Sequence, residues 1–532
     1  MSFSLIIHFK TQFMKTIITS IFSLGIMSAA LAQGSVTLSI ANSNVKYFVA
    51  NNGTFFNNPI PGNGAGGYVV PKDSAVSSIF GAFVMATGKD LNGNIKGAIA
   101  RGYNSDFSPG PYLPNVANYS DSSYTDKYSS ALWLVAKSQV DHHIAHWMDS
   151  GYVVPGMISS WPANGDSGNG ESFLLAPFHD QDGDQIYEPQ EGDYPLIRGD
   201  RTIYTIINDN KSPHPSGIDP VGMEIHMMFY QYDVPTDDLL TNTVFVQTTV
   251  FNRGTVTLQE FHLGHLIDFD LGDPYDDYIG TEPARNLAYI YNGDLNDEDF
   301  SGNPGYGVNP PASGIINLDG KLASNVSFPN FTDLNSAATN HNTLLGLLPN
   351  GAPVLDGNNQ PTKYIYNDID PNTGWNEFIG LANPPGDRFC VASMDEETFG
   401  PGKILCYNHA AIFARSGEGT LTASVDSLFQ VADHIQSFYD AQDFYCEAQY
   451  LELPEHGDLS FSLYPNPSDQ YLRVDGLTSG TYRILNLEGK EVSTGTLENP
   501  FIRVEFLKNG YYMLEITSGG KGGRKSFIKD GN

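Results

Sequence analysis

The chain is poor in cysteine and in basic residues. Only 3 of its 532 residues are cysteine, and 28 Lys and Arg stand against 60 Asp and Glu, which gives a net charge of −32. The excess is concentrated in residues 34–458, with 17 basic and 52 acidic residues, whereas residues 459–532 hold 9 and 8. A surface this acidic repels phosphates and anionic lipids, so we expect no nucleic-acid partner.

Three cysteines are too few for a disulfide framework, and none has the CxxC spacing of a thiolate zinc site. Cys390 and Cys406 lie in segments that resemble neighbouring strands. We therefore predict a Cys390–Cys406 disulfide, as expected in an oxidising compartment. Free buried thiols are the alternative.

Several catalytic signatures are also missing. The sequence contains no GxSxG elbow, no phosphate-binding glycine loop and no HExxH motif. These absences exclude little, because glycosidases and many peptidases on β scaffolds show only scattered carboxylates.

What the chain does contain favours β structure. Aromatics make up 12 % of the residues, charged residues only 17 %, and there are 54 Gly and 32 Pro. This composition suits short strands and many turns rather than helical bundles. The length allows two to four domains. We expect a large β-sandwich-like central region of one or two domains with one late helix, followed by a small C-terminal Ig-like β-sandwich.

Local patterns place the elements of the central region. Asn92-Gly93 predicts a hairpin turn, because this pair accepts positive φ. The spacing of Leu428, Val431, Ile435 and Phe438 predicts one helix with a buried stripe in residues 424–446. The strand candidates are 79–86, 95–100, 202–207, 224–232, 243–251, 288–291 and 410–414.

The N-terminus has the three parts of a secretory signal peptide. Lys15 is followed by a short apolar run over 17–27 and by Ala30-Leu31-Ala32 at the expected cleavage point. Residues 1–13 precede this pattern as an upstream extension, and 1–32 are assigned to the signal peptide. The apolar run is too short to span a bilayer stably, and we expect no transmembrane segment in the mature chain.

The chain changes character after a polar, turn-rich stretch. We assign 33–445 to the acidic cargo region, 446–458 to a linker and 459–532 to a separate domain. In that last part, apolar residues alternate at 472–474, 482–484, 502–504 and 512–516, with turn residues between the runs. The pattern predicts a small antiparallel β-sandwich.

Three segments of this domain carry a family resemblance: YPNPS at 464–468, GTYRILNLEGKEV at 480–492 and LKNGYYMLEI at 507–516. They resemble the type A C-terminal sorting domain of type IX secretion substrates. The resemblance implies a Bacteroidota bacterium and recognition of 459–532 by the type IX secretion machinery. It also implies an extracellular or outer cell-surface destination, with the cargo released or attached there.

An acidic segment at 180–191 reads DQDGDQIYEPQE. Carboxylates at positions 1, 3, 5, 9 and 12, with a main-chain carbonyl at 7, match the ligand spacing of an EF-hand-type calcium loop. Gln185 stands where such loops need glycine, and Pro189 prevents a regular following helix. A calcium loop of the kind found in extracellular β proteins therefore fits better, with a solvated acidic turn as the alternative. The predicted ligands are Asp180, Asp182, Asp184, Glu188 and Glu191.

A second acidic cluster, DFDLGDPYDD, occupies 268–277. Alternation points two of its carboxylates to one side of a strand end, and two more return after a turn. The cluster predicts a second calcium site; an acid and base pair, or an ordinary loop, are the alternatives. The predicted ligands are Asp268, Asp270, Asp273, Asp276 and Asp277.

A third cluster, DHHIAH, occupies 141–146. On a helix His142 and His146 share a face, as zinc-hydrolase ligands do, but His143 stands where the catalytic Glu would be. We expect a surface helical turn packed by Trp133, Leu134 and Trp147, with metal binding as the alternative.

Stretches of the central region, from about 79 to 440, resemble a recurrent family of uncharacterised cargo proteins that carry this sorting domain. The resemblance implies no catalytic residue. The matching stretches are SWPANGD at 160–166, APF at 176–178, GDYPLIRGD at 192–200, DLG at 270–272, DDYIG at 276–280, YNGD at 291–294 and PGDR at 385–388.

Two classes of function stay open. The first is a calcium-stabilised binding, adhesion or structural protein at the cell surface, with a glycan or protein ligand. The second is a secreted hydrolase that acts on polysaccharide or protein with paired Asp residues drawn from Asp268, Asp270, Asp276 and Asp277.

Overall fold

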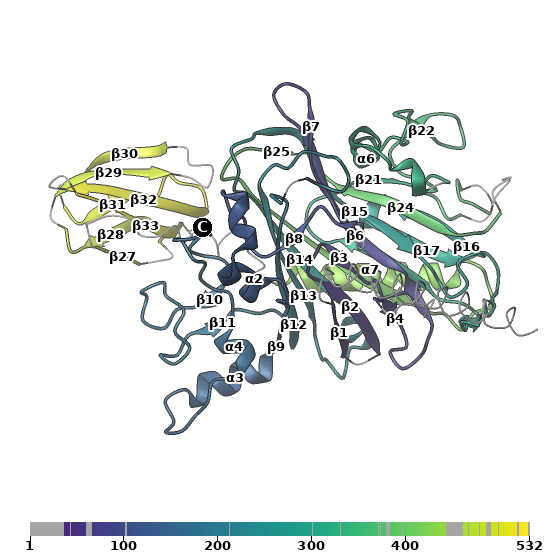
Figure 1. Cartoon of the computed structure of the whole chain (residues 1–532), viewed down its shortest axis with the longest axis horizontal. Helices are drawn as coiled ribbons and strands as arrows, with labels where there is room; N and C mark the ends of the chain where they lie inside the picture. The colour runs from purple at the N-terminus through teal and green to yellow at the C-terminus, as the bar shows by residue number, and fades with distance from the viewer. Residues whose placement is uncertain are drawn as a thin grey trace, which may run out of the picture.

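A computed structural model describes residues 37–442 and 461–529. Positions 43, 60–65, 102–103, 212, 301, 330, 371, 373, 379–383, 396, 466–467, 478, 486–490, 498 and 519–520 are excepted. The predicted signal peptide, the predicted linker and Cys446 lie outside the described residues. The described chain is mostly β, as predicted, and its paired strands are antiparallel (Figure 1). Within these ranges, the helices are too short or too polar to cross a lipid bilayer.

The first main sheet has 11 strands in the order β21-β24-β15-β6-β3-β2-β4-β5, with β1 beside β2, β25 beside β15 and β7 beside β6. Its strands are β1 (Thr37–Asn42), β2 (Val45–Ala50), β3 (Thr54–Phe55), β4 (Tyr68–Val69), β5 (Ser77–Ile79), β6 (Gly81–Lys89), β7 (Ile95–Ile99), β15 (Leu258–Phe269), β21 (Leu322–Val326), β24 (Arg388–Met394) and β25 (Glu397–Phe399).

The second main sheet has 9 strands in the order β16-β17-β20-β26-β14-β13-β12-β8, with β9 beside β12. Its strands are β8 (Ser108–Pro109), β9 (Trp133–Ala136), β12 (Arg201–Asn208), β13 (Met223–Gln231), β14 (Val244–Asn252), β16 (Asp277–Glu282), β17 (Leu287–Asn292), β20 (Ala312–Asn317) and β26 (Ile404–Ala414).

Short elements decorate these sheets. Three two-stranded ribbons pair β10 (Phe178–His179) with β11 (Tyr194–Pro195), β18 (Asn296–Asp297) with β19 (Gly307–Val308), and β22 (Val354–Leu355) with β23 (Pro361–Thr362). The helices are η2 (Val116–Ser120), α2 (Ser122–Tyr128), α3 (Lys137–His146), α4 (Gly156–Ser159), α5 (Asp238–Thr241), η3 (Pro283–Arg285), η4 (Phe331–Asp333), α6 (Ala337–Leu344) and α7 (Ala423–Asp440).

The second sheet is covered on both faces. Every residue of β13 is buried, and alternate side chains enter two different hydrophobic cores. Ile225, Met227 and Phe229 pack against the first sheet, while Met228 and Tyr230 pack against α7 and the segment that contains α2 and α4. The cargo therefore has three layers with this sheet in the middle, which explains why β13 and β14 are buried along their whole length.

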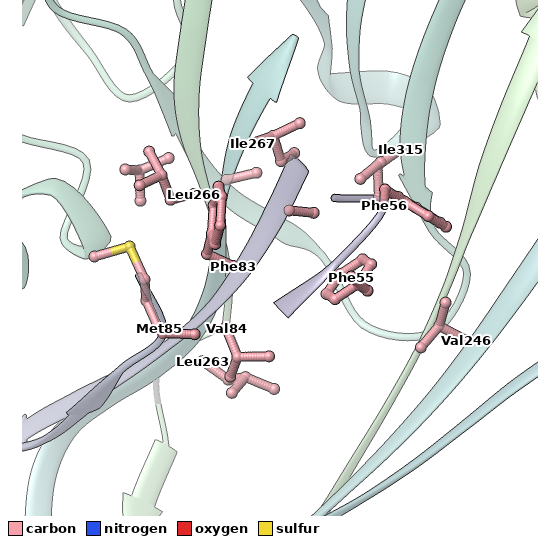
Figure 2. Close-up of a cluster of buried hydrophobic side chains, with 14 of the residues drawn as sticks. Phe55, Phe56, Phe83, Val84, Met85, Val246, Leu263, Leu266, Ile267 and Ile315 are labelled. Carbon is pink, nitrogen blue, oxygen red and sulfur yellow. The ribbon is translucent and has the colours of Figure 1, made fainter. Parts of the chain in front are cut away.

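Figure 2 shows part of the core between the two main sheets. Phe55 of β3 and the following Phe56 lie between β6 and β15 on one side and Val246 and Ile315 of the second sheet on the other. Both rings are at most 1 % exposed. Full burial of a Phe side chain contributes about 2 kcal/mol, so these two adjacent rings stabilise the sandwich more than such a short segment suggests.

The structure confirms the longer strands and the helix that the sequence patterns predicted. All seven predicted strand segments are strands, and β6 and β7 form the predicted hairpin, in which Gly93 has a φ of 82°. Helix α7 is present with Leu428, Val431 and Ile435 buried. The shorter helices and the two- and three-residue strands have no comparable signal in the sequence.

The predicted Cys390–Cys406 disulfide is wrong. Cys390 is a buried free thiol, and Cys406 is disulfide-bonded. Cys390 lies in β24 of the first sheet and Cys406 in β26 of the second. The alternation that identified both segments as strands does not say which sheet each strand joins.

Residues 461–529 form a separate group of strands, yellow in Figure 1. A 3-stranded sheet, β27-β28-β31, and a 4-stranded sheet, β30-β29-β32-β33, share one core that includes Leu472, Ile484 and Leu514. The predicted alternation is therefore confirmed. The strands are β27 (Ser462–Tyr464), β28 (Tyr471–Asp475), β29 (Gly480–Leu485), β30 (Glu491–Leu497), β31 (Phe501–Arg503), β32 (Gly510–Ser518) and β33 (Lys521–Lys529).

Two histidines meet inside the main sandwich. His265 of β15 and His409 of β26 come from opposite sheets, and their ring centroids are 4.5 Å apart beside Phe55. Both nitrogens of His409 and Nε2 of His265 are buried without a hydrogen-bond partner among the described residues. Burial lowers the pKa of His265 to about 4, and burial together with His265 lowers that of His409 well below its usual value. Both rings are therefore neutral at pH 7.

Acid should destabilise the sandwich through this pair. The unfolded chain binds a proton on histidine near pH 6.5, whereas His265 in the fold resists protonation until about pH 4. The stability associated with neutral His265 is thus lost as the pH falls from about 6.5 to about 4, by on the order of 3 kcal/mol. We expect His265→Leu to flatten the decline in unfolding free energy over this range, measured by urea denaturation. Exposed His142→Leu should keep the decline, and equal slopes in the parent and His265→Leu would contradict the prediction.

Candidate functional site

The segment 180–191 forms a loop between β10 and β11. Asp180 caps the loop, accepting hydrogen bonds from the backbone N–H groups of Gly183 and Gln185 at 2.7 Å each. Gln185 has a φ of 67°, so it adopts the left-handed conformation that calcium loops usually give to glycine. Carboxylate oxygens of Asp180, Asp182 and Asp184 lie within 4.8 Å of one another.

The other two predicted ligands of this loop do not belong to that group. The group within 4.8 Å consists of Asp180, Asp182 and Asp184. Glu188 and Glu191 lie near each other, since the charge of Glu191 raises the pKa of Glu188. Asp193, which the sequence did not single out as a ligand, is buried and accepts N–H groups from Gln181 and Glu188 at 2.8 and 2.7 Å. It holds the loop in shape rather than facing its open side.

The second acidic cluster lies at the end of β15. The antiparallel register pairs Asp268 with Phe389 and Phe269 with Arg388, so the next pair brings Asp270 opposite Asp387. Directly opposed residues share a face of the sheet. Oxygens of Asp268, Asp270 and Asp387 accordingly lie within 4.8 Å of one another. Asp387 was not predicted, because only the strand register brings it to this site.

Asp277 lies at the start of β16, where the chain enters the second sheet. Its Oδ2 accepts a hydrogen bond from the N–H of Leu271 at 3.0 Å. Its Oδ1 is buried without a hydrogen-bond partner in the described chain, and the residue is 0 % exposed. Asp276 beside it has both carboxylate oxygens buried in the same unpartnered state.

Asp273 closes a turn within this cluster. Its carboxylate accepts the N–H of Tyr275 at 3.0 Å, which closes a turn. Its own N–H donates to Asp297 Oδ1 at 2.8 Å, while the N–H of Tyr306 donates to Asp297 Oδ2. Asp297, 1 % exposed and absent from the predicted set, therefore ties the 271–277 loop to the ribbon of β18 and β19.

The carboxylates of Asp268, Asp270, Asp276, Asp277 and Asp387 form an acidic rim, and its charged groups are all of one sign. Burial, then repulsion from Asp387, raises the pKa of Asp268 to about 7, and burial, then Asp297, raises that of Asp276 to about 8. The pKa values of Asp270 and Asp277 are raised well above the usual range, chiefly by burial. Among the described residues, no ion pair joins these carboxylates to Lys, Arg or His. The nearby Arg388 pairs instead with buried Glu377, with Nε 3.1 Å from Oε1.

Oxygens this close can share one cation. Calcium takes 6–8 oxygen ligands at about 2.3–2.6 Å, so ligand oxygens in one shell lie up to about 5 Å apart. Such an ion would neutralise carboxylates that otherwise repel one another or bind protons.

The histidine cluster lies on helix α3, as expected, and its histidines differ in solvent exposure. His143 is buried, with Nε2 3.0 Å from the carbonyl oxygen of Asp193 and Nδ1 3.2 Å from the Tyr152 hydroxyl. The rings of His142 and His146 are in contact on the outer face, with centroids 4.3 Å apart and an interplanar angle of 43°. The groups that could hold a metal in the described chain are the two Asp triplets, and neither includes a histidine.

Comparison with known protein families identifies the C-terminal domain. Residues 462–530 match the family described as secretion system C-terminal sorting domain. The chain is a substrate of the type IX secretion system. Its destination is the extracellular space or the cell surface, and its sorting domain interacts with the secretion machinery.

No curated protein matches the chain. Among solved structures, a polysaccharide lyase aligns with 67 % of this secretion substrate and 40 % of its own length, at 9 % identity and a TM-score of 0.19. The alignment with this chain therefore covers less than half of the length of that lyase. A protein described as an aldose 1-epimerase from Escherichia coli K12 aligns with 72 % of the chain and 100 % of its own length, at 14 % identity and a TM-score of 0.22. Similarities this weak transfer no function to the secretion substrate.

Gly272 should be critical for the shape of the acidic rim. Its φ is +76°, and a Cβ there would overlap the carboxylate of Asp297, whereas Gly302 has a φ of +87° and open space around it. Gly302→Ala should cost about 1–2 kcal/mol for the left-handed backbone alone. Gly272→Ala should cost at least about 2 kcal/mol more, because Asp297 must move or lose its hydrogen bonds. Urea denaturation of both variants gives the comparison, and equal losses would contradict the proposed role of Asp297.

Proposed function

We propose that this secretion substrate is a calcium-stabilised binding, adhesion or structural protein that works outside the cell. The observation that carries the proposal is the convergence of Asp268, Asp270 and Asp387 next to Asp277, whose buried Oδ1 has no partner among the described residues. Like charges placed opposite one another destabilise a sheet unless something neutralises them.

Calcium suits this donor set better than other common metals. The converging donors are all carboxylate oxygens, whereas zinc and copper sites recruit histidine or cysteine. Magnesium demands a near-ideal octahedron and usually keeps several waters, so it is rarely held by a protein cage. Three carboxylates at a loop junction leave room for the larger and more adaptable shell of calcium.

The position of the cluster explains why an ion there would stabilise the fold. Asp268 and Asp270 end β15, and Asp387 precedes β24, both in the first sheet. Asp277 begins β16 in the second sheet, and its carbonyl accepts the N–H of Gly386 at 3.0 Å. A cation here would hold together the rim where the chain crosses between sheets.

The loop of Asp180, Asp182 and Asp184 supports a second calcium site. Its carboxylates converge, and Gln185 already has the left-handed backbone that such loops need. In this proposal Glu188 and Glu191 contribute charge near the ion, and closing of the loop brings one of them into contact with it.

The remaining parts of the proposal concern origin and route. We infer that residues 1–32 are a signal peptide and that the source is a Bacteroidota bacterium. The cargo, over about 79–440, is proposed to belong to the uncharacterised family it resembles.

A secreted hydrolase is the second candidate. A specific observation favours it: the pKa of Asp268 is raised to about 7, where a general acid is useful. A glycosidase, however, needs two carboxyl groups about 5–10 Å apart around a bond to be cleaved. The tighter triplet with Asp387 fits shared coordination better.

Calcium should raise the melting temperature of the secreted chain relative to the same protein in a chelator. At 100 times the dissociation constant, the linked stabilisation is about 2.7 kcal/mol, which corresponds to several degrees. Asp270→Asn and Asp387→Asn should each lose most of this rise and be more stable than the parent in the chelator, because one repelling charge is gone. The exposed Asp126→Asn is the matched control. Identical melting temperatures for the parent in calcium and in chelator would refute the calcium proposal.

The sorting domain should be required for passage across the outer membrane. We expect a chain that ends at Asp458 to accumulate inside the cell, with at least about a tenfold drop in the medium and surface fractions measured by immunoblot. A full-length chain with Asp126→Asn serves as the control for expression and folding. Efficient export of the truncated chain would show that another segment directs secretion.

A further inference from the structure

Two exposed aromatic rings belong to loops that are linked to the acidic cluster. Tyr275 is 57 % exposed and Phe300 is 37 % exposed, and their ring centroids are 4.8 Å apart at an interplanar angle of 53°. Single exposed hydrophobic residues are common on protein surfaces, but a solvated pair of rings in contact is a ready apolar platform.

The platform is attached firmly to the acidic rim. Tyr275 lies in the turn closed by Asp273, and Phe300 belongs to the ribbon loop in which its N–H donates to the Asn303 carbonyl at 2.9 Å. Asp297 links these two loops through the N–H groups of Asp273 and Tyr306. The rings are therefore positioned by the same buried carboxylate that shapes the rim.

The loop that carries Asp387 packs against the same turn. The N–H of Gly386 donates to the Asp277 carbonyl at 3.0 Å, and a Cβ on Gly386 would lie 4.0 Å from the Tyr275 carbonyl oxygen. Asp387 itself is exposed, whereas Asp268 and Asp270 are half-buried. An ion held by these three groups would thus be reached from solvent on the side of Asp387, whose loop contacts the backbone of Tyr275.

We propose that the Asp268–Asp270–Asp387 cluster and the Tyr275–Phe300 pair together form a calcium-dependent binding site for neutral carbohydrate with adjacent hydroxyl groups. The inference rests on the proposed function, since it needs calcium at the cluster. Three carboxylates fill only part of a shell of 6–8 oxygens, and two vicinal hydroxyls can complete it. The apolar face of the same sugar ring would stack on Tyr275.

Charge selects the class of carbohydrate. Three ionised carboxylates and one Ca²⁺ leave a net charge of about −1, with Asp276, Asp277 and Asp297 close by. The cargo as a whole is also strongly acidic. A polyanion such as polygalacturonate would be repelled, whereas a neutral mannan or glucan would not.

The test measures two steps on the full chain. Calorimetry with CaCl₂ alone establishes ion binding for the parent, Tyr275→Ala and Tyr275→Phe. Affinity electrophoresis through gels with soluble mannan, laminarin or polygalacturonate, in millimolar calcium or in EGTA, then measures carbohydrate binding. Phe173→Ala, which removes an exposed aromatic from a different loop, is the matched control.

We expect mannan or laminarin to retard the parent only in calcium. Tyr275→Ala should bind the carbohydrate at least about tenfold more weakly with unchanged calcium affinity, while Tyr275→Phe and Phe173→Ala behave as the parent. Calcium binding without retardation by either neutral polymer would overturn the carbohydrate site but leave the calcium proposal intact. Retardation that survives EGTA, retardation by polygalacturonate alone, or an unaffected Tyr275→Ala would also overturn it. Absence of calcium binding would refute the proposed function itself.

Discussion

Charge repulsion at one rim of the sandwich is the constraint on which the rest of the site depends. Asp268, Asp270, Asp276 and Asp277 gather where the chain leaves the first sheet and enters the second, and burial, then repulsion between neighbouring carboxylates, favours the neutral form of each. Two unit charges 4 Å apart repel by about 4 kcal/mol at an effective dielectric constant of 20. A fold that keeps several such groups together needs a proton or a cation to neutralise them. Protons can neutralise these carboxylates near neutral pH only because the groups are buried. A divalent cation can neutralise them at any pH at which they ionise.

The three-layer architecture explains why the charges gather at a rim. The middle sheet is apolar on both faces, since one face packs on the first sheet and the other on α7 and the helical segment before β12. Neither face can accept an uncompensated carboxylate at acceptable cost. The buried histidines His265 and His409 remain neutral, and the buried carboxylate of Glu224 is compensated by Arg253. The loops that join the sheets are therefore where acidic ligands can accumulate.

Local sequence patterns predicted those features that depend on residues close together in the chain. Strands β12, β13 and β14 are long and rich in apolar, aromatic and β-branched residues, the β6–β7 hairpin has Asn-Gly at its turn, and α7 has a clear periodicity. The Asp180 loop was recognised because its candidate ligands are contiguous. Asp387 was missed because its place opposite Asp270 depends on strand register between segments far apart in the chain. The Cys390–Cys406 pairing failed for the same reason, since periodicity identifies a strand but not its sheet.

The two parts of the chain differ in what they require to fold. The described sorting domain has its own apolar core, and its acidic and basic residues nearly balance, so it can fold without a bound ion. The cargo has a surplus of 35 acidic residues and a rim that calls for neutralisation. Calcium sites of extracellular modules commonly have dissociation constants of about 10⁻⁴–10⁻³ M, so sites of that strength fill outside the cell and stay empty where free calcium is scarce. With the proposed ions, recognition of the sorting domain is independent of calcium, while the rim of the cargo gains its full rigidity only at its destination.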